Sequence, residues 1–346
     1  MATANDQPRG VHLVGSVPLK DAEEVFRTTS RILGRHLRRI PDGETGVRSN
    51  WIGWQVDVFA KQPEFAMVPP DPQEYAPLPH FKLQPGSDVA KLVFGPLGYA
   101  DAARASYAVF SRLKAAGIVP AHCRFQVCLP TPLAPLVAFV AHEDAAAVEP
   151  AYEARLLAEL DEIVAAIPHD ELAIQWDTAV EFALLEGVWP AYFADVQAGI
   201  IERLIRIGKR VPAAVELGYH LCYGDAGHQH FVQPTDTSKL VAIANALAAG
   251  LMRPLAWIHL PVPRNRTDDP YFAPLRELQL RAETELYLGL VHFTDGVAGT
   301  RQRIAAAQRT VPAFGVATEC GLGRRPPETI PDLLRIHAEV AAPVVA

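Results

Sequence analysis

The sequence predicts an α/β protein built as a single (β/α)8 TIM barrel, and two observations lead to this prediction. Short runs rich in β-branched residues alternate with longer amphipathic stretches eight times along the chain, which favours a closed parallel barrel over an open sheet. No internal repeat or flexible linker divides the 346 residues, and such barrels often exceed about 250 residues as one unit. We therefore predict one domain over residues 1–346, with the ordered barrel at about 10–345.

The strands are expected where short apolar runs are bounded by turn residues. In chain order they are 10–15, 37–41, 124–129, 172–176, 213–218, 255–260, 286–292 and 313–317.

The helices are expected where apolar residues recur every three or four positions, as do Leu156, Leu160 and Ile163. Many of these stretches begin near Asp, Thr or Pro, which suit helix N-termini. In chain order they are 21–33, 99–116, 144–166, 192–207, 237–249, 272–285, 299–308 and 330–340.

Segment 62–98 interrupts this alternation, because it is rich in proline and polar residues. We interpret it as a long excursion after strand two that passes over the mouth of the barrel. Two tryptophans shortly before it, Trp51 and Trp54, either stack on a flat substrate or pack as a lid on the core, and the second interpretation is the more usual one.

Charge and composition exclude several classes of partner. The net charge is −7 and no long basic run occurs, so neither nucleic acid nor an anionic membrane is an expected partner. Residues 1–9 carry no apolar signal sequence, and the longest apolar run, 133–140, is too short to cross a bilayer. Four cysteines in so long a chain do not indicate a disulfide framework, and the sequence predicts a cytoplasmic protein with reduced thiols.

Chemically active side chains follow the predicted strands. In a (β/α)8 barrel the C-terminal strand ends share one mouth, where active sites lie. The residues expected there are Ser16, Glu44, Asp177, His220, Cys222, His259, His292, Asp295 and Cys320.

Three of these residues have the chemistry of a metal site. His220 and Cys222 are two positions apart on an extended segment, so their side chains point to the same side. Cys320 follows the last strand, which closes next to the first. Thiolates and an imidazole favour zinc over hard cations. The spacing alone is equally consistent with two structural cysteines and an unrelated histidine.

Several motifs resemble those of the cobalamin-independent methionine synthase family, in its C-terminal barrel. Tyr219-His220-Leu221-Cys222-Tyr223 and Cys320-Gly321-Leu322 are similar to its zinc signatures. Val14-Gly15-Ser16-Val17-Pro18 is similar to its first-strand motif, Asp42-Gly43-Glu44 to its acidic second-strand motif, and Gln175-Trp176-Asp177 to the strand that supplies an acidic residue to the substrate. The matches run in order from residue 14 to residue 325.

The resemblance implies a role for each matching residue. His220, Cys222 and Cys320 would be zinc ligands, Ser16 would face the substrate carboxylate, and Glu44 and Asp177 would face its amino group. The wider superfamily also contains uroporphyrinogen decarboxylases and epoxyalkane–coenzyme M transferases.

The sequence departs from the family pattern in three places. The family has a glutamate zinc ligand after strand six, where this chain has His259; His259 is either a further ligand or a hydrogen-bonded histidine at the rim. The strand-seven histidine that moves a proton is shifted, so His292 or Asp295 is predicted to take that role. The family's additional N-terminal barrel, which helps hold a polyglutamated folate, has no counterpart in these residues. The loop with Asp225, His228 and His230 is interpreted as a substrate loop, with a second metal site as the alternative.

These inferences predict a zinc-dependent methyl or alkyl transferase that activates a thiol such as homocysteine as a zinc-bound thiolate. The expected partners are a small-molecule thiol and an alkyl donor, which is a pterin, a corrinoid protein, a methoxylated compound or an epoxide. The alternatives are another reaction of the superfamily, such as a decarboxylase or lyase, and a non-enzymatic zinc-binding protein. The acidic pair Glu44 and Asp177 argues against the last, because structural zinc needs no substrate-shaped rim.

Overall fold

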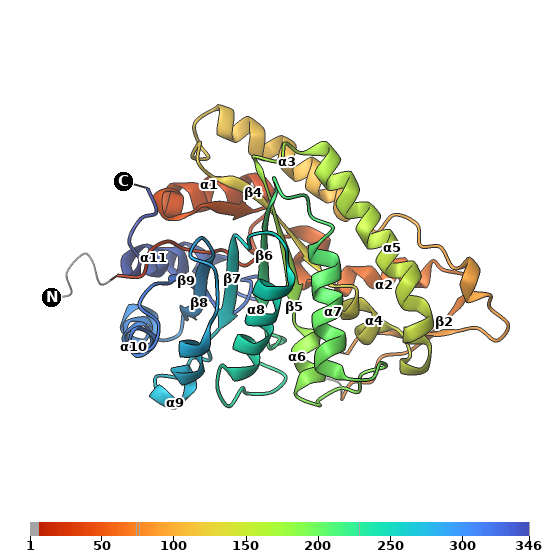
Figure 1. Cartoon of the computed structure of the whole chain (residues 1–346). Coiled ribbons are helices and arrows are strands. Elements are labelled where there is room, and N and C mark those ends of the chain that lie inside the picture. Colours follow the sequence, from red (N-terminus) through yellow and green to blue (C-terminus); the bar gives the residue numbers. More distant parts are fainter. Residues whose placement is uncertain (1–6, 74, 76, 228, 346) are drawn as a thin grey trace.

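Seven parallel strands form one curled sheet at the centre of the computed structural model, which describes residues 7–345 except 74, 76 and 228 (Figure 1). The strand order is β1-β4-β5-β6-β7-β8-β9, and every pairing within it is parallel. The strands are β1 (Arg39–Pro41), β4 (Arg124–Pro130), β5 (Leu172–Thr178), β6 (Glu216–Leu221), β7 (Trp257–Pro261), β8 (Glu285–Val291) and β9 (Gly315–Thr318). The parallel sheet and seven of the eight predicted strands are thus confirmed, with shifts of a few residues at their ends.

The first predicted strand, 10–15, is not a strand in the structure. Val11 makes one parallel bridge to Leu37, just before β1, and one to Val316 in β9, so this segment touches both edges of the sheet. The ladder is short because Gly10 has φ of +90°, outside the extended region. The next carbonyls turn inward: Gln126 Nε2 donates to Leu13 O at 3.0 Å and Gln175 Nε2 donates to Val14 O.

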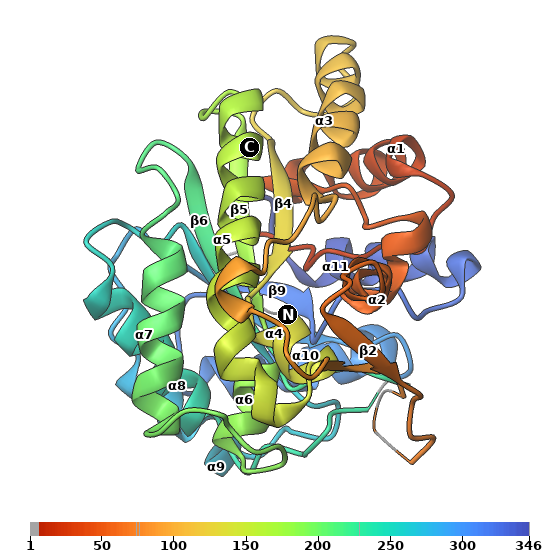
Figure 2. The ribbon, with the colours of Figure 1, turned by 90° about the vertical axis from the view of Figure 1, so that its right-hand side faces the viewer.

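Helices follow the strands and cover the outside of the sheet (Figures 1 and 2). In α1, Asp21 caps the N-terminus by accepting a hydrogen bond from Glu24 N at 2.9 Å, and Val25, Phe26 and Leu33 are buried. The α-helices are α1 (Ala22–Leu33), α2 (Val56–Ala60), α3 (Tyr99–Ala115), α4 (Leu133–Phe139), α5 (His142–Ala166), α6 (Val180–Leu185), α7 (Val196–Gly208), α8 (Ser238–Gly250), α9 (Asp269–Phe272), α10 (Gly296–Gln308) and α11 (Ile330–Val340).

One predicted helix, 272–285, is wrong. The chain there forms α9, a short 3-10 helix (Ala273–Glu277) and an extended approach to β8. The periodic leucines of this segment imitate a helical pattern, but Asn245 of α8 binds both the Glu277 carbonyl, at 2.8 Å, and the Gln279 N–H, at 2.7 Å. These bonds satisfy backbone groups that a helix would otherwise pair internally.

The excursion after the second predicted strand has structure of its own. It follows α2 and contains an antiparallel hairpin of β2 (Phe65–Val68) and β3 (His80–Leu83). Ala141 N donates to Phe81 O at 2.9 Å, which ties the hairpin to the junction of α4 and α5. Figure 1 shows β2, in orange, beside these helices. The predicted excursion is confirmed.

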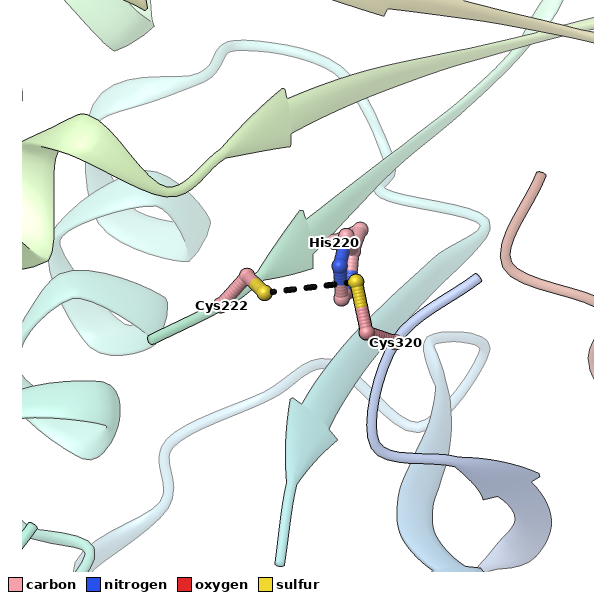
Figure 3. Close-up of side chains that lie close together, drawn as sticks. All are labelled: His220, Cys222 and Cys320. Carbon is pink, nitrogen blue, oxygen red and sulfur yellow. Dashed lines mark hydrogen bonds between the residues drawn. The ribbon is translucent and has the colours of Figure 1, made fainter. Parts of the chain in front are cut away.

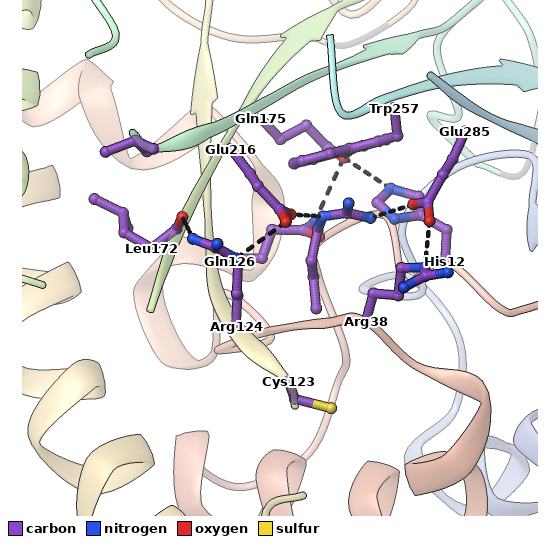
Figure 4. Close-up of polar contacts among 12 residues, drawn as sticks. His12, Arg38, Cys123, Arg124, Gln126, Leu172, Gln175, Glu216, Trp257 and Glu285 are labelled. Atoms are coloured by element: carbon purple, nitrogen blue, oxygen red, sulfur yellow. Dashed lines mark hydrogen bonds and ion pairs between the residues drawn. The ribbon is translucent and has the colours of Figure 1, made fainter. Parts of the chain in front are cut away.

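Buried polar groups fill the interior of the curled sheet near the N-terminal strand ends (Figure 4). The Arg39 guanidinium is almost fully buried, pairs with Glu216 and Glu285, and stacks 4.2 Å from the centre of the Trp257 ring. His12 Nε2 lies 2.8 Å from Gln175 Oε1, which also accepts from Trp257 Nε1 at 3.2 Å. These contacts fill the interior at this end of the sheet.

In the part of the chain that the structure describes, no helix combines the length and the apolarity that a membrane span requires.

Candidate active site

His220, Cys222 and Cys320 come together at the C-terminal ends of β6 and β9 (Figure 3). Their potential ligand atoms all lie within 4.8 Å of one another. The two sulfur atoms are 3.7 Å apart. Thr318 fixes the Cys320 backbone by donating from Oγ1 to the Cys320 carbonyl at 2.7 Å. The three residues predicted from spacing and resemblance thus form one cluster.

His259 lies directly beside His220. Asp177, His220 and His259 occupy matching positions on β5, β6 and β7, so their side chains project to the same side of the sheet. The Nδ1 atoms of the two histidines are 2.6 Å apart. His259 is not part of the 4.8 Å cluster found among the described residues, and its role as a ligand stays a prediction.

Burial keeps both imidazoles neutral. It holds the pKa of His220 well below its ordinary value, with His259 and His12 lowering it further, and it lowers the pKa of His259 to about 3. His220 Nε2 is buried and has no hydrogen-bond partner within the described part of the chain. A neutral imidazole with one ring nitrogen unused, next to two sulfur atoms, is a donor set that fits a soft divalent cation such as zinc.

The thiols also fit a bound cation. Cys222 is buried, and its hydrogen bond with Cys320 together with burial raises its pKa well above the ordinary value. Such a thiol stays protonated near neutral pH unless a cation stabilises the thiolate.

Ser16 is held against the loop that carries Cys320. Leu322 N donates to Ser16 O at 2.7 Å, and Gly323 N donates to Ser16 Oγ at 3.1 Å. A Cβ atom on Gly321 would lie 2.3 Å from Ser16 Oγ, so only glycine fits there without displacement. The first-strand motif and the Cys-Gly-Leu motif, about 300 residues apart in the chain, form one substructure.

Glu44 and Asp177 lie close together and both line the cavity described below, and their role toward a substrate stays a prediction. The Asp42 carboxylate shapes the Glu44 turn by accepting from Glu44 N at 2.9 Å, and Arg48 and Ser106 hold Asp42 at 2.6 and 2.7 Å. Gln175 Nε2 donates to Asp177 Oδ1 at 2.8 Å.

The acidic pair is electrostatically coupled. Burial, followed by the charge of Glu44, raises the pKa of Asp177, and burial raises that of Glu44 against the opposing effect of Arg48. Cys128 completes a second group within 4.8 Å. A thiol beside these carboxyls is not expected from the sequence.

His292 and Asp295 lie apart from this centre, and neither lines the cavity described below. Arg303 binds both oxygens of Asp295, at 2.7 and 2.8 Å, and lowers its pKa. His292 Nε2 bonds to Val262 O at 2.9 Å, and its Nδ1 is 3.6 Å from Glu319. Glu319, which precedes Cys320, also lies 3.3 Å from His230 Nε2. The proton-transfer role of His292 or Asp295 stays a prediction.

A cavity of about 930 Å³ opens at this end of the sheet. Ser16, Glu44, Asp177, His220, Cys222 and Cys320 all line it. Its remaining wall includes residues that carry no sequence motif, among them Tyr75, Trp189 and Arg324. Asp225 of the predicted substrate loop lines it as well, whereas His228 lies outside the described residues.

Neither a family model nor a curated protein sequence matches the chain. Among solved structures, a B12-independent methionine synthase from Shewanella sp. W3-18-1, in complex with selenomethionine, matches with a TM-score of 0.63 at 13% identity, covering 96% of this chain and 96% of that one. A putative vitamin-B12-independent methionine synthase from Listeria monocytogenes matches with a TM-score of 0.60 at 13% identity, covering 96% and 97%. A methyltransferase from Methanosarcina mazei matches with a TM-score of 0.55 at 10% identity, covering 96% and 94%. Because these likenesses span nearly all of each chain, the protein has the fold of the B12-independent methionine synthases, as the motifs indicated.

Proposed function

We propose that this protein is a zinc-dependent methyl or alkyl transferase whose acceptor is the thiol of a small amino acid such as homocysteine. The observation that carries the proposal is that the His220, Cys222 and Cys320 cluster opens on the same cavity as Ser16, Glu44 and Asp177. A structural metal site has no need of this polar rim. The folds matched above include a methionine synthase solved with selenomethionine, which supports an amino acid of this class.

The metal-binding residues would be His220, Cys222 and Cys320, with His259 as a fourth ligand or as the partner that orients His220. When bound there, zinc would supply a Lewis acid that lowers the pKa of the acceptor thiol. The buried Nε2 of His220 and the adjacent sulfurs are the atoms of this chain suited to hold it.

The remaining polar residues would hold the amino acid. Glu44 and Asp177 would bind its ammonium group, because a cation between two buried carboxyls stabilises their charged forms against burial and, at Asp177, against the charge of Glu44, which together raise its pKa. Ser16 Oγ, which is held by Gly323 N of the loop that carries Cys320, would donate a hydrogen bond to the carboxylate of the amino acid. Holding the acceptor in one orientation lowers the entropic part of the barrier.

For proton transfer, the geometry favours His292 over Asp295. Both carboxylate oxygens of Asp295 are bound by Arg303. His292 Nδ1, in contrast, lies 3.6 Å from Glu319, the neighbour of Cys320. We include His292 in the proposal through this contact.

Two further parts of the proposal concern the fold and its setting. We propose that the Val11 segment closes the sheet as an eighth, irregular strand, supported by its bridges to both edges. We also propose a reducing, cytoplasmic location, supported by four cysteines that are all free thiols.

Metal content of the purified protein tests the proposal. We expect about one zinc per chain, because one His220, Cys222 and Cys320 cluster binds one ion. We expect Cys222→Ser and Cys320→Ser to lose that zinc. Cys123→Ser is the matched control, because Cys123 is buried and bonds Leu37 O at 3.4 Å, away from the cluster. Adding homocysteine to the cobalt-substituted protein should change its absorption spectrum.

Three results would contradict the proposal. Zinc-free protein would favour metal-free decarboxylase or lyase chemistry, and zinc retained in both cysteine variants would show that the metal is not held by Cys222 and Cys320. If zinc is bound but no small thiol changes the absorption spectrum of the cobalt-substituted protein, the site is a closed structural site.

A further inference from the structure

The cavity has two chemically different parts. The polar end holds the metal cluster and the acidic pair. The outer chamber, which we define by its wall of Trp51, Leu78, Val137, Val140, Trp189 and Tyr192, extends beneath the β2–β3 hairpin to α4 and α5. These six side chains are aromatic and aliphatic, and the lining of the same elements also includes His80 of β3 and His142 of α5, so the walls favour a largely apolar ligand.

The outer chamber has a roof that is fastened across the cavity. Tyr75, from the hairpin connection, donates from its hydroxyl to Gln229 O at 2.5 Å and accepts from Ala226 N at 2.7 Å. Its ring lies 6.4 Å from that of Trp189 and 6.1 Å from that of Phe231, measured between ring centres. The excursion is thereby joined to the loop after β6.

The cavity lining contains few carboxylates and guanidinium groups. Among the described residues that line the cavity, the carboxylates and guanidinium are Glu44, Asp177, Asp225 and Arg324, and Arg324 pairs with Asp225 at 3.3 Å. The described wall of the outer chamber contains no lysine, arginine, aspartate or glutamate. A buried ionic group without a partner is strongly disfavoured, so this chamber suits an uncharged ligand.

The size of the cavity leaves room for a second molecule. At about 930 Å³ it is near the upper end of the range of roughly 300–1,000 Å³ that is typical of small-molecule sites. An amino acid with its ammonium group between Glu44 and Asp177 and its sulfur at Cys222 occupies only the polar end. The outer chamber, which belongs to the same cavity, would then be free for a second molecule.

We propose that the outer chamber binds the alkyl donor, and that this donor is a flat, uncharged aromatic methyl ether. This inference rests on the proposed function for the identity of the acceptor. In the transfer, a bond forms between the acceptor sulfur and the methyl carbon while the bond from that carbon to the ether oxygen breaks. The thiol proton ends on the aryl oxygen, so a thiol and an aryl methyl ether give a methyl thioether and a phenol. No oxidant or reductant is required.

The proposal separates this donor from two others. A polyglutamylated pterin carries several carboxylates, for which the described wall of the chamber offers no cation. A corrinoid carried by a second protein could reach the sulfur only after the Tyr75 contacts to Ala226 and Gln229 had opened.

Calorimetric titration with 1,2-dimethoxybenzene tests the chamber directly. We expect one molecule per chain and at least a tenfold weaker affinity in Val137→Asp, which places a carboxylate in the wall. Val47→Asp is the matched control, since Val47 is 81% exposed, and Trp189→Ala, which removes wall area without adding charge, should also weaken binding. Cys222→Ser should bind the probe as the wild type does, because the chamber does not include the cluster.

The arms of this experiment distinguish the two proposals. If zinc and thiol binding fail but the ether binds with the Val137 dependence, the proposed function is wrong and the chamber assignment holds. If the protein binds zinc and thiol but not the ether, or binds it equally in Val137→Asp, the donor assignment is wrong. Tighter binding of pteroyltriglutamate than of the ether would also overturn it. Mass spectrometry after incubation with homocysteine and the ether should detect S-methylated homocysteine and 2-methoxyphenol.

Discussion

At the scale of single residues, the contact between His220 and His259 fixes which ring nitrogen of His220 is available. Two neutral imidazoles 2.6 Å apart through their Nδ1 atoms can bond only if one donates and the other accepts. If His220 donates, its buried Nε2 carries a lone pair and can bind a metal ion. His259 then orients the ligand, in the way that outer-shell groups act in zinc sites.

Replacing His259 tests this arrangement. We expect His259→Phe to weaken zinc binding by about 10–100-fold, as is typical when such a partner is lost. His259→Asn should retain part of the affinity, because its amide oxygen can accept the same hydrogen bond. Affinity is measured by competition with a chelator, and the visible spectrum of the cobalt form separates the roles. An unchanged spectrum in His259→Asn indicates an orienting residue, and an altered one indicates a ligand; wild-type affinity in both variants would exclude either role.

Glu181 gives a pH prediction at the same scale. It is fully buried on α6 beside Thr131, whose hydroxyl donates to it, and burial raises its pKa from 4.5 to about 7. Because the folded state then binds this proton more tightly than the unfolded state, Glu181 lowers stability as pH rises from about 4.5 to about 7. Above about pH 7 the loss of unfolding free energy is constant, and below about pH 4.5 it is absent.

We therefore expect Glu181→Gln to flatten the fall of unfolding free energy between these pH values, by an amount on the order of 3 kcal/mol. Urea denaturation at a series of pH values measures it. Glu328→Gln, at an exposed position, is the control and should leave the profile unchanged. Parallel profiles for wild type and Glu181→Gln would show that Glu181 is ionised throughout.

At the scale of elements, the Ser16 segment and the loop after β9 behave as one unit. In Gly321→Ala the new methyl group would overlap Ser16 Oγ, 2.3 Å away, and should displace the neighbouring Cys320. We expect weaker zinc binding in this variant and partial recovery in Gly321→Ala with Ser16→Gly, which removes the clashing atom. Chelator competition on the three variants measures the coupling; independent, additive effects would show that the contact does not position Cys320.

The elements that the sequence predicted are those whose pattern is local. Helix Ile330–Val340 was predicted to the residue because its apolar spacing is uninterrupted. The prediction for segment 272–285 was wrong because the backbone there pairs with Asn245, 32 residues from Glu277. The β2–β3 hairpin was missed because only β3 alternates polar and apolar residues, and it does so over four residues.

The same reasoning applies to the site. His220, Cys222 and Cys320 could be predicted because their residue types and motifs carry the chemistry. Tyr75 and Trp189 could not, because an aromatic side chain becomes part of a cavity wall only through the path of a distant loop.

At the scale of the whole molecule, stability and binding are assigned to opposite ends of the sheet. Arg39 is buried between Glu216 and Glu285 at the end away from the cavity. Arg39→Ala would remove the buried cation shared by Glu216 and Glu285 and leave each carboxylate only its more exposed cationic partner, Arg124 or Arg38, and we expect a loss of about 3 kcal/mol in unfolding free energy. Arg38→Ala, which removes a half-exposed partner of Glu285, should cost less than about 1 kcal/mol. Urea denaturation compares the two, and similar losses would contradict the buried role of Arg39.

The layering of the cavity has a kinetic consequence. In the proposed reaction the acceptor would lie at the strand ends and the donor in the outer chamber, which the Tyr75 contacts span. A molecule seated in the chamber blocks the way to the polar end, so the two substrates must enter in a compulsory order, amino acid first. The aromatic product must leave before the thioether, and an excess of donor should trap the empty enzyme in a dead-end complex.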